Sequence, residues 1–530
     1  MPDWQLAYHQ NNMNADIDHH LSTGAQPSIV EHFSIENLYG YRSIGLSSAY
    51  AATVLIAKNG SGKTTLLGAL DAFLKGQFGR LSTLKFETIT CKLRGLDDPL
   101  ILRSEDILAS QAALSDPFFI DHAARIGLEP ILLLDFFDYD YRLLKNAKSL
   151  EDNEVYEKIV SKFRWSRVEA NKVCESIYSS LRGRNANIDR IRDALDEVVG
   201  DMEIVYLPTY RRIELPLSSE SDEPYSKKKS IQSRLGISKR GLLNADIRFG
   251  LSDISERLSA LNQSILFDSN EGYRTISANI INELISGAIE NEDLSLEQRP
   301  SKDALELFFS RIRDGRRRMH MGPFRDVVIP DIDKIYSGED IPQQSNKFLT
   351  YFLSKLNTVI AATRDIELMV EEFITNCNRY LSSEDKTTVA PTNQGAEKTC
   401  FPPDDSKVLK LDRRNLQVSV ESIAARKKVP LESLSSGEKQ MISLFARLYL
   451  FPGKKVVLID EPELSLSIYW QRQILMDVVS APSCAQVVAI THSPFVFDNA
   501  LEPFAKALSS SFNYQMEEAS TNEDEDDTNA

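Results

Sequence analysis

Runs of apolar residues broken by turn residues predict a strand, a tight turn and a helix near the start of this chain. Residues 54–56 are aliphatic, residues 59–62 read Asn-Gly-Ser-Gly, and residues 64–74 carry apolar side chains at helical spacing. A short apolar run bounded by glycine is typical of a buried strand, and apolar residues at i, i+3 and i+4 are typical of an amphipathic helix. We therefore expect a strand that ends in a glycine turn and leads directly into a helix.

Further apolar runs predict strands elsewhere in the chain. Residues 31–46 suggest two short strands joined by a turn, which we expect to form an antiparallel edge beside the glycine turn. Additional strands and one hairpin are predicted at 86–94, 131–134, 202–207, 407–411 with 417–420, 456–459 and 486–490. The strand at 202–207 is expected to belong to the core sheet, although helical segments surround it.

The middle of the chain is predicted to be mainly helical. Segments 140–199, 245–290 and 302–381 carry apolar residues at helical spacing among many charges. Heptads are not sustained, so a long coiled coil is not expected. The polar stretches 214–240 and 382–405 are typical of a linker and a loop.

These patterns predict an α/β protein whose sheet-forming ends are separated by a large helical insertion. A length of 530 residues fits about two or three domains. The expected segments are a flexible N-terminus (1–28), an N-terminal lobe (29–139), a mainly helical insertion (140–404), a C-terminal lobe (405–510) and an acidic disordered tail (511–530).

Composition and charge narrow the class of protein. Hydrophobic residues make up 42% and charged residues 26%, as in ordinary globular domains. No run of about 18 apolar residues predicts a membrane span, and residues 1–28 lack the apolar segment of a signal peptide. The five scattered cysteines have no metal-ligand spacing, so a cytoplasmic location is expected. The net charge is −16, but seven acidic residues fall in 516–530, which leaves room for local basic patches.

The glycine turn carries chemistry as well as structure. With Lys63 and Thr64 behind it, it matches the phosphate-binding pattern G-x-x-x-x-G-K-[ST], except that Ala57 replaces the first glycine. Glycines let backbone N–H groups converge on phosphate oxygens, and the helix N-terminus adds partial positive charge. Lys63 would reach the β- and γ-phosphates of ATP, and Thr64 would bind Mg²⁺. The candidate nucleotide-binding residues are Asn59, Gly60, Ser61, Gly62, Lys63, Thr64 and Thr65.

Three further elements near the C-terminus carry polar groups that suit a nucleotide site. Ser435 and Gly437 open an apolar helix, where they form either a second anion site or an ordinary helix N-cap. Asp460 and Glu461 end a buried strand, so Asp460 is a candidate Mg²⁺ ligand and Glu461 a candidate base for the attacking water. His492 ends the next strand and is either a contact to the γ-phosphate or a structural histidine.

In this order, the phosphate loop, the Ser-Ser-Gly-Glu turn and the two strand ends resemble the ATP-binding-cassette (ABC) ATPases, in the branch that contains SMC and RecF-like proteins. The resemblance covers 29–95 and 405–500 and implies an ABC-type head, ATP and Mg²⁺ as cofactors, and a homodimer with ATP between the subunits. The resemblance implies that Lys63 is the Walker A lysine and Thr64 the Mg²⁺ ligand beside it. It implies that Asp460 is the Walker B aspartate and Glu461 the catalytic glutamate. Ser435 and Gly437 would then be the contacts of the signature motif, and His492 the switch histidine.

The long insertion favours one group within this branch. Lys63 and Ser435 are 372 positions apart, and the 38 residues after His492 are expected to leave no room for a toprim nuclease. The insertion shows no HNH, D-x-E-x-K or zinc-type nuclease pattern. This layout resembles PtuA, the ATPase of Septu anti-phage systems and of some retrons. That resemblance implies an HNH nuclease partner, PtuB, and in a retron a reverse transcriptase with its msDNA.

Two other functions remain open from the sequence. A RecF-like repair or recombination clamp would bind DNA directly, and a scaffold or translation-linked cassette protein would need no nuclease. Two basic clusters in the insertion bear on this choice, Lys227 to Lys229 and Arg316 to Arg318. They are either solvated surface or a phosphate-binding face for nucleic acid or an acidic partner.

Overall fold

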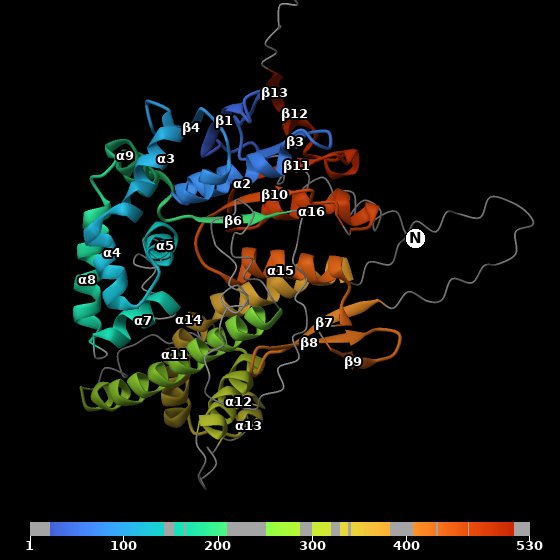
Figure 1. Ribbon diagram of the computed structural model, residues 1–530. Coiled ribbons are helices and arrows are strands. Elements are labelled where there is room, and N and C mark those ends of the chain that lie inside the picture. The colour runs from blue at the N-terminus through green and yellow to red at the C-terminus, as the bar shows by residue number, and fades with distance from the viewer. Residues whose placement is uncertain are drawn as a thin grey trace, which may run out of the picture.

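The computed structural model is a mixed α/β protein, with most strands in the upper part of Figure 1 and long helices in the lower part. It describes residues 22–141, 153–163, 166–208, 251–286, 299–319, 329–337, 341–381, 406–430, 433–464 and 466–512. None of the helices in those segments has the length and apolar character needed to cross a bilayer. The predicted linker, the predicted loop, the acidic tail from residue 513 and the N-terminus up to residue 21 lie outside the described residues.

A parallel sheet forms the core that carries the candidate site. Its described strands, in spatial order, are β12 (Ala505–Ala507), β3 (Ala52–Ile56), β11 (Cys484–Thr491), β10 (Lys455–Asp460) and β6 (Glu203–Leu207). Each neighbouring pair is parallel. The predicted core strand at 202–207 is thus confirmed as β6, beside β10. Because parallel strands place their carboxyl ends at one edge, the ends of β3, β10 and β11 lie together.

Different helices cover the two faces of this sheet. Helix α2 (Lys63–Leu74) lies on one face, and helices α15 (Ser436–Leu450) and α16 (Ile468–Ser480) lie on the other (Figure 1). Side chains alternate along β10, so Leu458 packs into the same core as α2, whereas Ile459 packs with α15 and α16. The sheet therefore separates the N-termini of α2 and α15.

A second, antiparallel sheet flanks the core. Its described strands, in spatial order, are β13 (Ser509–Phe512), β2 (Arg42–Ser47), β1 (Val30–Leu38), β4 (Thr88–Leu93) and β5 (Leu100–Arg103). The predicted strand pair at 31–46 and the strand at 86–94 are confirmed. The buried side chain of Gln486 joins the two sheets, because its Oε1 accepts from the backbone N–H groups of Ile29 and Val30 at 2.9 and 2.8 Å.

A first helical group packs beside the antiparallel sheet. Its described helices are α3 (Ser104–Gln111), α4 (Pro117–Ile126), α5 (Pro130–Asp135), α7 (Glu154–Lys162), α8 (Arg167–Leu181) and α9 (Ala186–Val199). The predicted strand at 131–134 is wrong, because these residues form α5. Pro130 starts that helix at its first turn, and Leu133 and Leu134 share a hydrophobic core with Phe119 of α4 and Tyr156 of α7. A short apolar run does not distinguish a strand from a helical turn by periodicity alone.

A second helical group forms the lower part of Figure 1. It contains the long helices α11 (Leu251–Ser286) and α14 (Gln343–Leu381), which pack along each other, and the shorter α12 (Lys302–Met319) and α13 (Ile332–Ser337). The predicted helical segments at 245–290 and 302–381 are confirmed for their described residues. Ile254 of α11 and Phe373 of α14 share a core with α15, so these two long helices are anchored on the face of the parallel sheet that α15 covers.

A small antiparallel sheet, β7 (Lys407–Asp412), β8 (Gln417–Ser422) and β9 (Lys427–Val429), connects the second helical group to α15, and β7 and β8 confirm the predicted hairpin. The turn between β7 and β8 enters a cluster of charged side chains, here called the ionic junction, which consists of Arg311, Arg364, Glu367, Glu371 and Arg413.

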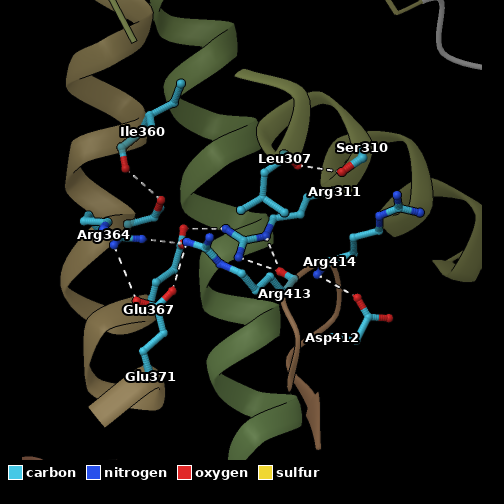
Figure 2. Close-up of polar contacts among 11 residues, drawn as sticks. Leu307, Ser310, Arg311, Ile360, Arg364, Glu367, Glu371, Asp412, Arg413 and Arg414 are labelled. Carbon is cyan, nitrogen blue, oxygen red and sulfur yellow. Dashed lines mark hydrogen bonds and ion pairs between the residues drawn. The ribbon is translucent and has the colours of Figure 1, made fainter. Parts of the chain in front are cut away.

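The ionic junction is held by a buried ion pair (Figure 2). The Arg311 guanidinium donates to Glu367 Oε1 at 2.6 Å, and both side chains are nearly buried, at 4% and 7% exposure. The Nε and Nη2 atoms of Arg311 donate to the backbone oxygen of Arg413 at 2.9 and 2.6 Å. Arg311 thus has a structural role in α12. The side chains of Arg316 to Arg318 and all of Lys227 to Lys229 lie outside the described residues, so the predicted nucleic-acid face stays a prediction.

Candidate active site

The phosphate loop has a backbone that requires glycine. Gly60 and Gly62 have φ angles of +79° and +91°, in the left-handed region that side chains other than glycine rarely adopt. A Cβ on Gly62 would also come within 3.1 Å of the Ile44 side chain. Helix α2 begins at Lys63 with no side-chain cap, so its first N–H groups are available to an anion.

Arg42, which belongs to no motif in the sequence, supports this loop from the antiparallel sheet. Its Nη1 donates to the backbone oxygen of Gly60 at 3.0 Å, and its Nε is buried without a partner. The guanidinium therefore lies against the turn that would hold phosphate. A single arginine at a predicted hairpin gives no signal of this contact in the sequence, because the contact depends on how the two sheets pack.

Lys63 brings the phosphate loop onto the end of β10. Its Nζ donates to Asn59 Oδ1 at 3.1 Å and pairs with Glu461 Oε1 at 2.5 Å. The side chains of Lys63 and Glu461 are 7% and 15% exposed. Residues 398 positions apart therefore form one ion pair, in which Lys63 is buried and Glu461 is partly exposed. A nucleotide phosphate at this loop would compete with Glu461 for the same ammonium group.

Thr64 and Asp460 form a second contact between the same two elements. Thr64 Oγ1 donates to Asp460 Oδ2 at 2.5 Å, and Asp460 is fully buried. Asp460 Oδ1 is buried without a hydrogen-bond partner, which is costly unless a ligand or cation uses it. A hydroxyl beside a carboxylate fits Mg²⁺, which takes few protein oxygens and keeps phosphate oxygens and waters. No group of three or more His, Cys, Asp or Glu suited to a metal occurs in the described segments.

Glu461 has a strained backbone at the strand end. Its φ angle is +52°, unusual for a residue with a side chain, while its N–H donates to the backbone oxygen of Ile490 at 2.8 Å. Strained residues of this kind concentrate at sites where the side chain must point in one direction. Because of this turn, the Glu461 carboxylate points toward Lys63 and does not continue the alternation of side chains along β10.

His492 lies beside two carboxylates. Its Nδ1 is 3.0 Å from Glu463 Oε1 and 3.6 Å from Glu461 Oε1, and its side chain is 49% exposed. Glu463 was not singled out from the sequence. The available signal was a second glutamate two residues after Glu461 in the Glu-Pro-Glu segment that follows a buried strand. The structure thus brings Lys63, Thr64, Asp460, Glu461 and His492 to one edge of the sheet.

Ser435 and Gly437 lie at a different place. Ser435 caps α15: its Oγ accepts from the N–H of Glu438 at 3.2 Å, and Glu438 accepts from the N–H of Ser435. Lys407 of β7 holds the Glu438 carboxylate at 3.1 Å. The N-cap alternative is therefore observed, while the second anion site stays a prediction. Because α2 and α15 cover opposite faces of the sheet, this turn does not join the phosphate loop of its own chain.

Residues 405–498 match the sequence profile of a family described as "AAA domain, putative AbiEii toxin, Type IV TA system". The match supports a P-loop ATPase family. It contains Ser435, Asp460, Glu461 and His492 but not the phosphate loop, which the fold brings onto Asp460 and Glu461 from outside the matched segment. No curated protein matches the chain.

The geometry at this edge of the sheet has the parts that phosphoryl transfer to water requires. The phosphate loop and Lys63 would hold the phosphates, and Asp460 with Thr64 would hold Mg²⁺, which neutralises charge on the phosphate oxygens. Glu461 would orient and deprotonate a water. The site therefore combines an ammonium group, two carboxylates and an imidazole where β3, β10 and β11 end.

Proposed function

We propose that this chain is an ATP-binding and ATP-hydrolysing ABC-type ATPase that closes around ATP as a homodimer and regulates a partner nuclease in anti-phage defence. The observation that carries the ATPase part is the pairing of the phosphate loop with the end of β10, Lys63 with Glu461 and Thr64 with Asp460. The profile match supports a P-loop ATPase family. The large helical insertion supports the choice within that family.

The separation of the two helix N-termini supports the proposed homodimer. A γ-phosphate at Lys63 faces one end of α2, while the Ser435 turn opens α15 on the other face of the sheet. One chain cannot direct both N-termini at one phosphate. Two chains related by a two-fold axis can place each Ser435 turn against the other chain's phosphate loop, which yields two equivalent composite sites.

The composite site is tested by the mass of the protein in the presence of ATP. On a Glu461→Gln background, which slows hydrolysis, ATP should convert the single chain into a dimer that light scattering measures. Adding Ser435→Arg should leave ATP binding to one chain intact and block the dimer, because the arginine fills the turn that faces the partner's phosphate. An equal dimer fraction with and without Ser435→Arg would refute the trans arrangement.

A matched control separates the turn from the loss of a helix cap. Ser166 caps α8 through the N–H of Glu169 at 3.4 Å, much as Ser435 caps α15, but lies in the first helical group. Ser166→Arg should therefore leave the ATP-dependent dimer unchanged.

A Lys63→Ala chain mixed with a Ser435→Arg chain should regain at most one composite site per dimer.

The effector part of the proposal concerns a second chain. The partner is proposed as an HNH nuclease of the PtuB kind, with a reverse transcriptase and msDNA if the system is a retron. Co-purification with neighbouring gene products, followed by mass measurement, tests it. A complex with an HNH nuclease supports the proposal. A chain that binds DNA alone, with affinity falling steeply as salt rises, would instead favour a RecF-like clamp.

A further inference from the structure

Glu463 has no role in the chemistry proposed above, yet its carboxylate lies beside the reacting groups. It follows β10 by three residues, and its side chain is 6% exposed. No arginine or lysine is paired with it among the described residues. A buried carboxylate without a cationic partner costs free energy unless hydrogen bonds to it compensate.

One oxygen of Glu463 lies within hydrogen-bond distance of three groups at the end of β11. Its Oε1 accepts from Thr491 Oγ1 at 2.7 Å and from the backbone N–H of His492 at 3.1 Å, and it lies 3.0 Å from His492 Nδ1. Its Oε2 is buried without a partner. Both the backbone and the ring of His492 are therefore fixed by the same carboxylate.

This contact decides which ring nitrogen of His492 is free. Since a carboxylate accepts hydrogen bonds, Nδ1 carries the proton that faces Glu463, and Nε2 remains for other partners. Half of the His492 side chain is exposed, so packing alone does not hold the ring. We infer that Glu463 is a positioning residue that acts through His492, holding the imidazole so that Nε2 serves the terminal phosphate of a bound nucleotide.

The same contact keeps His492 away from the candidate base. Glu461 Oε1 is 3.6 Å from Nδ1 and already pairs with Lys63 at 2.5 Å. Without Glu463, the Nδ1–H group would have Glu461 as its nearest carboxylate, and that pairing would divert the base from water. Loss of Glu463 should therefore slow the chemical step and leave the phosphate loop, which binds ATP, unchanged. This inference rests on the ATPase function proposed above.

The test is a double-mutant cycle on the full-length chain, with kcat and the dissociation constant for ATP measured for each variant. Glu463→Ala should lower kcat by about 10- to 100-fold, the loss expected for a charge-assisted hydrogen bond, and should leave the dissociation constant within about twofold. In a His492→Ala background the same substitution should have no further effect, because the ring it positions is gone.

Two companion variants guard against a trivial loss of folding. Glu463→Gln keeps one acceptor oxygen, so kcat should fall by only about three- to tenfold, again with no effect in the His492→Ala background. Glu367→Gln alters an equally buried glutamate in the ionic junction, at 7% exposure, and should leave kcat unchanged. If Glu463→Ala does not fold, the Glu463→Gln cycle decides.

The outcomes separate this inference from the proposed function. A wild type without ATP turnover, or a Glu461→Gln variant with the wild-type rate, refutes the proposed function and this inference with it. When those two behave as expected, three results overturn the inference alone: wild-type kcat for Glu463→Ala, wild-type kcat for His492→Ala, or losses that multiply in the double variant.

Discussion

Two buried clusters of charged side chains in this molecule differ in how completely their polar atoms are satisfied. In the ionic junction, Arg311 and Glu367 bond to each other and to the β7–β8 turn, and none of the junction's buried side-chain atoms lacks a partner (Figure 2). At the sheet edge, one oxygen of Asp460 and one of Glu463 are buried without partners. Glu461 adds a left-handed backbone conformation.

The comparison teaches which cluster is built for stability and which for binding. A fully bonded ion pair fixes α12, α14 and the hairpin in one arrangement and has no capacity left for a ligand. Unpaired acceptors and strained backbone lower stability, so they persist where a ligand or a reaction uses them. A substitution in one cluster should therefore affect either stability or nucleotide binding, and both are measured for each variant.

The largest expected effect is on nucleotide affinity at the sheet edge. Lys63→Ala removes the cation that we propose binds the phosphates and should weaken ATP binding by about 100-fold or more, as measured by calorimetry. Thermal unfolding should change little, because Glu461 is partly exposed and can hydrate. Unchanged ATP affinity would show that the phosphate loop does not hold the nucleotide.

The next effect is on stability at the ionic junction. Glu367→Ala leaves the Arg311 guanidinium buried without its carboxylate and should lower the free energy of unfolding by about 3–5 kcal/mol, as measured by urea denaturation. ATP turnover should be unchanged at temperatures where the variant is folded. A loss of turnover without a loss of stability would mean that the junction acts on the site rather than on the fold.

The Mg²⁺ assignment predicts a change in metal dependence. Asp460→Asn keeps the shape of the side chain but removes the charge of its unpaired oxygen. Wild-type turnover should stop when EDTA removes Mg²⁺ and return when the ion is added back. The variant should need a higher Mg²⁺ concentration, by about tenfold, to reach half of its maximal rate. The same Mg²⁺ requirement in both proteins would contradict the assignment.

A smaller effect on stability concerns a third buried charge, that of Lys455. Its Nζ donates to backbone oxygens just after the end of α15, including those of Phe451 and Gly453 at 2.7 and 2.9 Å. Burial, and then the nearby Arg447 guanidinium, lower the pKa of Lys455 to about 8. The unfolded chain then binds more protons than the folded chain from pH 8 up to the ordinary lysine pKa, so stability should rise with pH in that window.

The Lys455 effect is measured against Lys455→Met, which does not titrate. Between pH 7.5 and pH 9.5, the free energy of unfolding of the wild type relative to this variant should increase by about 1–2 kcal/mol. Like the ionic junction, this cluster should affect stability and leave ATP turnover unaltered. A difference that stays constant with pH would show that Lys455 keeps its proton when folded.

The sequence predicted the elements whose signals are local. The glycine turn, the apolar run before Asp460 and the run before Thr491 each carry their pattern within about ten residues, and the structure has them as β3 to α2, β10 and β11. The strand at 202–207 was also predictable, because its apolar residues stand out among helices. The strand predicted at the four apolar residues 131–134 was wrong, since Pro130 starts a helix that tertiary packing stabilises.

The remaining parts of the site depend on contacts between distant segments. Glu463 is an ordinary surface-type residue in the sequence and becomes a buried acceptor only when β11 lies beside β10. Arg42 reaches Gly60 because two sheets pack together. The position of Ser435 on the far face of the sheet follows from which side of β10 α15 covers, and no local pattern determines that side.

The central claim is that the carboxylate beside Asp460 activates water against ATP held by the phosphate loop. A single-turnover measurement of ATP hydrolysis by wild type and Glu461→Gln, with ATP binding measured on the same samples, tests it most directly. We expect the variant to bind ATP at least as tightly, because Lys63 loses its competing partner, and to hydrolyse it at least about 100-fold more slowly. Hydrolysis by the variant at the wild-type rate would contradict the claim.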